Sequence, residues 1–122
     1  MKRLILEIGS GADLYGLDYS KAATRAVQET LRHSSITLFR ALEIDHTEMN
    51  VVVTIGVQEP DKVSREQVIS HIPRGNPELR IVFGGQNISD ETGTVTSVVA
   101  TCAIEAFIPD LSTRFSVVKR AL

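Results

Sequence analysis

The residues whose types and spacing best suit chemistry form the segment GSGADLYG, residues 9–16. One carboxylate, Asp13, lies among three glycines, and these are Gly9, Gly11 and Gly16. Glycine adopts positive φ without strain and lets a ligand approach the backbone closely. Asp13 can accept N–H groups from a ligand or act as a general base. The alternative is structural, with Asp13 capping its own turn.

The segment does not match the known phosphate-binding patterns. The third glycine of Gly-x-Gly-x-x-Gly would fall at position 14, where this sequence has Leu14. The Gly-Lys-Ser/Thr ending of a Walker loop is absent, and a carboxylate in the loop repels phosphate. We therefore expect a small-molecule site with Asp13 as the candidate catalytic residue and Tyr15 among its ligand-binding residues.

Two later loops supply further candidate ligand-binding residues. Arg74, in PRGNP, can bind an anionic group bidentately or remain a solvated loop arginine. Gly84 and Gly85 can present backbone N–H groups to a ligand or simply turn the chain. Glu105 is a charge inside an otherwise apolar run, where we expect it to pair or to line a cleft.

Metal ligands and cofactor patterns are not indicated. The three histidines are far apart in the sequence: His33, His46 and His71. Asp45, His46 and Glu48 form either a polar loop or an ion site. We expect no metal site, and no cofactor can be assigned.

The apolar pattern predicts strands and helices that place these residues. We expect strands at 3–8, 50–57, 78–83 and 94–108, helices at 19–33 and 63–72, and a polar loop at 84–93. Ser64 and Gln67 have the spacing of a helix start, and Val63 can pack against Val68. Residues 34–49 suit a short helical turn or a strand, and the C-terminal tail is ambiguous.

This order, β-α-(x)-β-α-β-β, predicts that residues 1–122 form a single domain with an α+β fold. We expect a single mixed sheet with two or three helices on one face. Right-handed crossovers place both glycine-rich loops at the same edge of the sheet, where ligands of open α/β sheets usually bind.

Composition narrows the function class. The chain has 122 residues and a formal net charge of −2, which disfavours nucleic acid as a partner. No apolar stretch approaches the ~20 residues of a membrane-spanning helix. A single cysteine, Cys102, is what we expect of a cytoplasmic protein, where thiols stay reduced. Cys102 lies in an apolar run, so we expect it to be a buried, inert thiol.

Two strands are apolar on both faces, although the predicted helices can cover only one. These strands are 50–57 and 94–108. A large exposed apolar face is unusual in a soluble monomer. We therefore expect a homo-oligomer, a trimer or larger, that buries the second face. The alternative is that the C-terminal tail folds back over it.

The segment GSGADLYG resembles the GxGxDxHG motif of a small family of uncharacterised bacterial and plant proteins. Gly9, Gly11, Asp13 and Gly16 match it, while Tyr15 stands where the family pattern has histidine. The resemblance extends to HIPRGNPELRIVFGG and the last strand, and it implies a site without naming a reaction. The layout also resembles the small trimeric α+β chorismate mutases, which place active sites between subunits.

Together these observations predict a cytoplasmic homo-oligomer with a small-molecule site on the Gly9–Gly16 loop. An enzyme acting at a subunit interface is one form of this hypothesis. The alternative is a non-catalytic ligand-binding or structural oligomer, in which the loop only shapes subunit contacts.

Overall fold

The structure is a computed structural model that describes residues 2–33, 50–72 and 76–108. The elements, in chain order, are β1 (Lys2–Asp13), α1 (Tyr19–His33), β2 (Asn50–Val57), η1 (Pro60–Lys62), α3 (Arg65–Ile69), β3 (Asn76–Phe83), β4 (Gln86–Ser89) and β5 (Val95–Ile108). Predictions made for residues 34–49, for Arg74 and for the C-terminal tail lie outside the described residues.

The strands form one mixed sheet in the order β1-β5-β2-β3, with β4 paired to β5. β5 is antiparallel to β1, β2 and β4, while β2 and β3 are parallel. β1, β2 and β3 therefore run in the same direction, and their C-terminal ends lie at the same edge of the sheet, across the strands. This confirms the α+β class and the expected edge for both glycine-rich segments.

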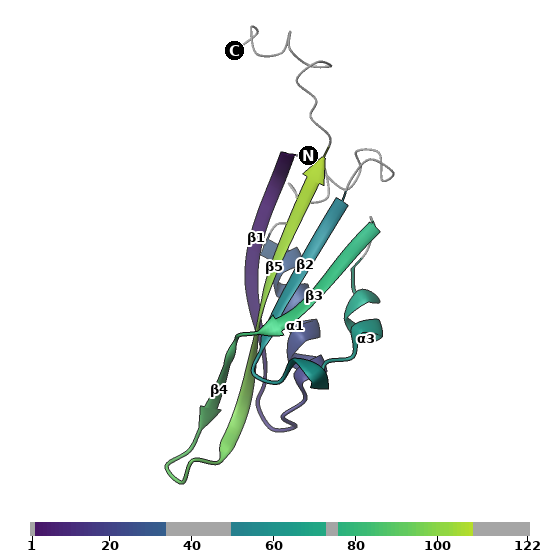
Figure 1. Cartoon of the computed structure of the whole chain (residues 1–122). Coiled ribbons are helices and arrows are strands. Elements are labelled where there is room, and N and C mark those ends of the chain that lie inside the picture. Colours follow the sequence, from purple (N-terminus) through teal and green to yellow (C-terminus); the bar gives the residue numbers. More distant parts are fainter. Residues whose placement is uncertain (1, 34–49, 73–75, 109–122) are drawn as a thin grey trace, which may run out of the picture.

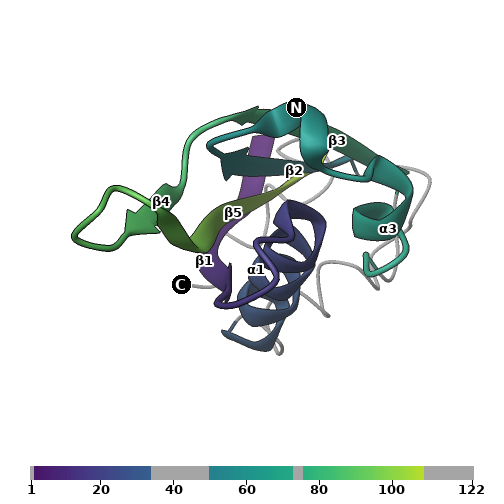
Figure 2. The same ribbon diagram turned by 90° about the horizontal axis from the view of Figure 1, so that it is seen from below.

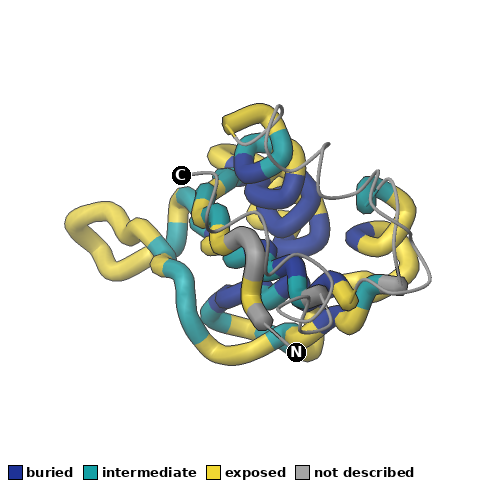
Figure 3. Tube along the Cα trace, turned by 90° about the horizontal axis from the view of Figure 1, so that it is seen from above, coloured by how far each residue is buried: buried dark blue, intermediate teal, exposed yellow. Residues whose placement is uncertain are grey.

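The two helices α1 and α3 lie on one side of the sheet, as predicted (Figure 1, Figure 2). α1 buries a face of small residues against the sheet, which allows a close approach. That face contains Ala22, Ala23, Ala26, Val27 and Thr30. Figure 3 shows the buried stretch of this helix against the strands. The opposite side, which we call the open face, carries Leu6 and Ile8 of β1 and Val82 of β3.

The helix at 63–72 is shorter than predicted, but its start is as expected. Ser64 is the N-cap of α3, and its side chain accepts a hydrogen bond from the Gln67 N–H. Val63 and Val68 both belong to the hydrophobic core. Pro60 begins a separate 3₁₀ turn, η1, and proline is tolerated at this first position because an N–H there would have no partner within the turn.

The prediction of a polar loop at 84–93 was wrong for Gln86–Ser89. Residues Gln86–Ser89 form β4, which pairs with the first half of β5 and makes a hairpin arm. The arm projects beyond the sheet and is largely exposed (Figure 1, Figure 3). Its turn is held by Asp90, whose carboxylate accepts hydrogen bonds from Thr92 and from the Thr94 N–H. Backbone pairing can form a strand even where side chains are polar.

Candidate functional site

The glycine-rich segment is strand for most of its length, so the loop is shorter than predicted. β1 continues through Gly9 and Gly11 to Asp13, and only residues 14–18 connect it to α1. Both glycines face the helix. A Cβ on Gly11 would lie 2.6 Å from the Ala22 carbonyl oxygen, and one on Gly9 would lie 2.5 Å from Thr30 Oγ1. These two glycines therefore let α1 pack directly on the strand.

Asp13 is buried, with 6% of its surface exposed, and both its oxygens have partners. Oδ2 accepts the Asp18 N–H at 2.8 Å, and Oδ1 lies 3.5 Å from Arg25 Nη1. The same Arg25 nitrogen donates to the Ala12 carbonyl at 2.7 Å. The carboxylate thus joins the end of β1 to the start of α1 across the loop.

The rest of the loop is shaped around this carboxylate. A Cβ on Gly16 would lie 2.8 Å from Asp13 Oδ2, so a side chain there would displace the carboxylate. Leu17 has φ of 51°, a left-handed conformation that is uncommon outside glycine. Asp18 caps α1 by accepting the Lys21 N–H at 3.1 Å. The loop is therefore a defined turn whose remaining side chains point outward.

Those outward side chains border a hollow of about 470 Å³ between the loop and the start of β5. Its lining residues are Leu14, Tyr15, Leu17, Val95, Thr96 and Ser97. Tyr15 is 95% exposed in the isolated chain. The lining combines apolar side chains with three hydroxyl groups, and no charged side chain is among these lining residues. Among the predicted site residues that the structure describes, only Tyr15 borders this hollow, and Asp13 is buried.

Five of the six lining residues were missed by sequence reasoning. The signal available for Leu14 and Leu17 was two large apolar side chains in a short loop just before a helix. Val95, Thr96 and Ser97 gave no such signal. They reach the loop because β5 pairs with β1 as far as Asp13, which lies opposite Val98.

Gly84 and Gly85 lie at the same edge of the sheet but not in this hollow. Gly84 donates its N–H to the Val57 carbonyl at 2.9 Å, and Gln58 Nε2 donates to the Gly84 carbonyl at 3.0 Å. Gly85 has φ of 62°, and a Cβ there would lie 2.7 Å from the Gly56 carbonyl oxygen. Both glycines therefore fit a tight turn that crosses close to β2.

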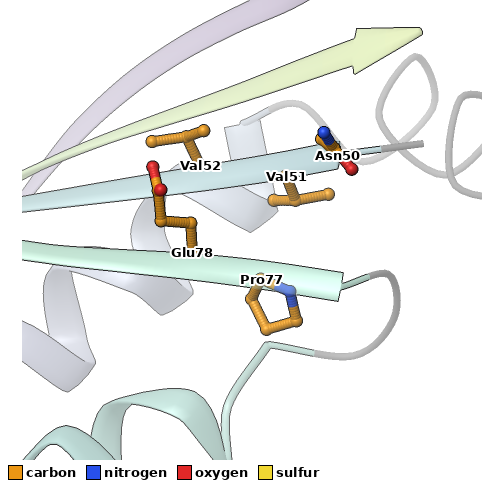
Figure 4. A pocket seen from close by; sticks show the side chains of 5 residues that line it. All are labelled: Asn50, Val51, Val52, Pro77 and Glu78. Carbon is orange, nitrogen blue, oxygen red and sulfur yellow. The ribbon is translucent and has the colours of Figure 1, made fainter.

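A second hollow, of about 380 Å³, lies at the opposite end of β2 and β3 (Figure 4). It is lined by Asn50, Val51, Val52, Pro77 and Glu78. Glu78 forms an ion pair with Arg80 at 2.7 Å. None of the predicted site residues with a described position borders this hollow.

The other candidate residues have ordinary structural roles. Burial raises the pKa of the Cys102 thiol to about 11, and a hydrogen bond with Thr30 offsets this only in part. The thiol is therefore protonated at neutral pH, as expected of an inert cysteine. Glu105 pairs with Arg3 at 3.4 Å. His33 contacts Glu29 at 2.6 Å.

Within the described ranges no three His, Cys, Asp or Glu side chains are grouped as a metal site would require. In the same ranges, no helix combines the length and the apolar character that crossing a membrane needs.

Comparison with known protein families identifies one family that matches most of the chain. Residues 3–106 match the family described as conserved hypothetical protein (Lin0512_fam). The chain belongs to the Lin0512 family. This agrees with the expected membership of an uncharacterised family. No match was found among curated proteins.

A solved structure supports the fold of this family member. The crystal structure of an FtsZ-like protein of unknown function from Nostoc punctiforme PCC 73102 is similar, with a TM-score of 0.73 and 28% sequence identity. The similarity covers 89% of this chain and 97% of that one. The fold is therefore shared over nearly the whole of both chains.

Proposed function

We propose that this Lin0512 family member binds an uncharged small molecule in the hollow beside the 14–18 loop, as part of an assembly of its own copies. The observation that carries the proposal is the exposure of Leu14, Tyr15 and Leu17 around one hollow. Its volume, about 470 Å³, falls within the range of about 300–1,000 Å³ that is usual for ligand pockets.

The chemistry of the lining supports an uncharged ligand. Apolar side chains with a few polar groups are typical of small-molecule sites, where the polar groups fix orientation. Here Thr96, Ser97 and the Tyr15 hydroxyl supply those groups. The loop carboxylate is already paired with Arg25 and the Asp18 N–H, so it attracts no cationic ligand into the hollow.

A second copy of the chain would give the hollow a further wall. The hollow is a shallow depression that is largely open to solvent, and Tyr15 is almost fully exposed. The layout expected from the sequence, which resembles that of the chorismate mutases with sites between subunits, is one reason for proposing this arrangement. A catalytic role for Asp13 stays a prediction, as do ligand contacts of the motif glycines, Arg74, Gly84 and Gly85. We also propose a cytoplasmic location, because buried Cys102 is a free thiol.

A thermal-shift screen with neutral metabolites, followed by affinity measurements on variants, tests the site. A ligand present at 100 times its dissociation constant stabilises the protein by about 2.7 kcal/mol. We expect Leu14→Ser to weaken binding of a screened compound at least about tenfold, or ~1.4 kcal/mol. Ile69→Ser is the matched control, since Ile69 is also an exposed apolar side chain but lies on α3.

Equal affinity in Leu14→Ser and wild type would contradict the proposed site. The assembly is tested separately by sedimentation of the unmodified chain at micromolar concentration. A mass of 13.4 kDa would show a monomer and would contradict the assembly while leaving the ligand site open.

A further inference from the structure

The outer side of β1 forms a long lateral edge of the sheet. This lateral edge has no strand neighbour in the described part of the chain. β1 is the first strand in the order β1-β5-β2-β3, and among the described strands this 12-residue strand pairs with β5 alone. Figure 1 shows β1 along this edge. A free strand edge presents backbone N–H and C=O groups that another strand can bind. At the C-terminal end of β1, Arg25 already donates a hydrogen bond to the Ala12 carbonyl. The middle of β1 is therefore the candidate site for pairing with another strand.

The other strand edges carry features that discourage such pairing, and the middle of β1 does not. β3 has Pro77, followed by an ion pair between Glu78 and Arg80 at 2.7 Å. β4 has only four residues. Prolines, charges and short length are the usual means of blunting an edge. From Leu6 to Ala12 the one charged residue is Glu7, and there is no proline.

The side chains beside this edge are apolar and exposed. Ile8 is 66% exposed and Leu6 is 42% exposed, both on the open face of the sheet. Ser10 and Ala12 follow on the same face and are small. A strand that paired here would cover Leu6 and Ile8 in part while it satisfied the backbone groups.

We infer that the outer edge of β1 pairs with β1 of a second copy, antiparallel and about a two-fold axis at Ile8. This inference rests on the assembly part of the proposed function and assigns it a surface. In this register Ile8 faces the partner's Ile8, and Leu6 faces the partner's Ser10. Glu7 faces the partner's Gly9, so the two carboxylates are not opposed.

The register follows from the residues themselves. Centring the axis on Glu7 would place two like charges directly opposite, which destabilises a strand pair. Centring it on Ile8 brings the most exposed of the described apolar side chains of β1 against its own copy. A two-fold contact uses the same patch on both chains, so the patch must be self-complementary, and this register makes it so. Pairing joins the two sheets into one continuous sheet.

Sedimentation of wild type, Ile8→Lys and Val82→Lys across 1–100 µM tests the inference. Both positions are exposed apolar residues on the open face, but Val82 lies on β3 at the far edge. We expect a wild-type assembly with an even number of copies. Ile8→Lys should weaken it at least tenfold, whereas Val82→Lys should not. Circular dichroism and melting temperature verify that both variants fold.

Three sedimentation results would overturn the inference. These are a wild-type monomer, an unchanged mass in Ile8→Lys, and an equal loss in both variants, which would indicate packing through the open face. Hydrogen exchange of the wild type gives an independent readout. The amides of residues 6–10 should become more protected as concentration rises, and no change there would also overturn it. A monomer that still binds a screened ligand would end this inference without touching the ligand site.

Discussion

Asp13 holds the end of β1 to the start of α1 through two kinds of contact. One oxygen accepts the Asp18 N–H at 2.8 Å, and the other faces Arg25 at 3.5 Å. The Arg25 side chain is half exposed, so the ion pair is screened by water and contributes less than about 1 kcal/mol. The hydrogen bond from the Asp18 N–H is partly buried and matters more, because a hydrogen bond to a charged group contributes about 1.5–3 kcal/mol.

Two substitutions at Asp13 separate these contacts from a ligand role. Asp13→Asn keeps an acceptor oxygen, so we expect a loss of less than about 1 kcal/mol in the free energy of unfolding. Asp13→Ala leaves the Asp18 N–H without its acceptor, and we expect a loss of about 2 kcal/mol. Urea unfolding measures both. If Asp13→Asn were as stable as wild type but lost a screened ligand tenfold, the carboxylate would have a direct role at the site.

At the scale of elements, α3 shows how a local pattern sets the start of a short helix. Ser64 accepts the Gln67 N–H at 3.3 Å, while the Ser64 N–H donates to Ser20 Oγ of α1 at 2.7 Å. Val68 is fully buried in the core. The cap therefore fixes the helix start, and the contact with Ser20 ties that start to α1.

Removing the cap should destabilise the protein by a predictable amount. We expect Ser64→Ala to lower the free energy of unfolding by about 1 kcal/mol, or about 4 °C in melting temperature for a chain of this size. Ser70→Ala is the matched control at the other end of α3. Its hydroxyl donates to the exposed Gln67 carbonyl, which water can satisfy instead. Equal effects of the two variants would contradict the assigned cap.

At the scale of the whole molecule, stability is concentrated where α1 covers the central strands. Val53 and Ile55 of β2 and Ile104 of β5 are almost completely buried. The β4–β5 arm projects from this core, and most of its residues are exposed (Figure 3). Amides in such a peripheral unit open at lower free energy than those of the core.

Native-state hydrogen exchange should separate these two regions. We expect the amides of Val53 and Ile55 to exchange only through global unfolding. The amides of β4 should exchange faster, through local opening of the arm. Equal protection of the two would mean that the arm is covered in solution.

Local chemistry determined several elements from the sequence alone. The apolar run of β2, the spacing of Ser64 and Gln67, and the stripe of small residues in α1 depend on neighbours within a few positions. These predictions were confirmed in type, although the helix and loop boundaries shifted. The sequence also predicted one sheet with its helices on one side, because helical segments separate the first three predicted strands.

The tertiary structure alone decided the strand order and the content of the site. β5 lies between β1 and β2, which no local pattern indicates, since backbone pairing of distant segments is nearly independent of side chains. That placement brings Val95 and Ser97 beside Leu14 and forms the hollow. The packing of α1 on β1 puts the Asp13 carboxylate against the Asp18 N–H and Arg25. The same motif that suggested a catalytic loop is thereby held by contacts visible only once the chain has folded.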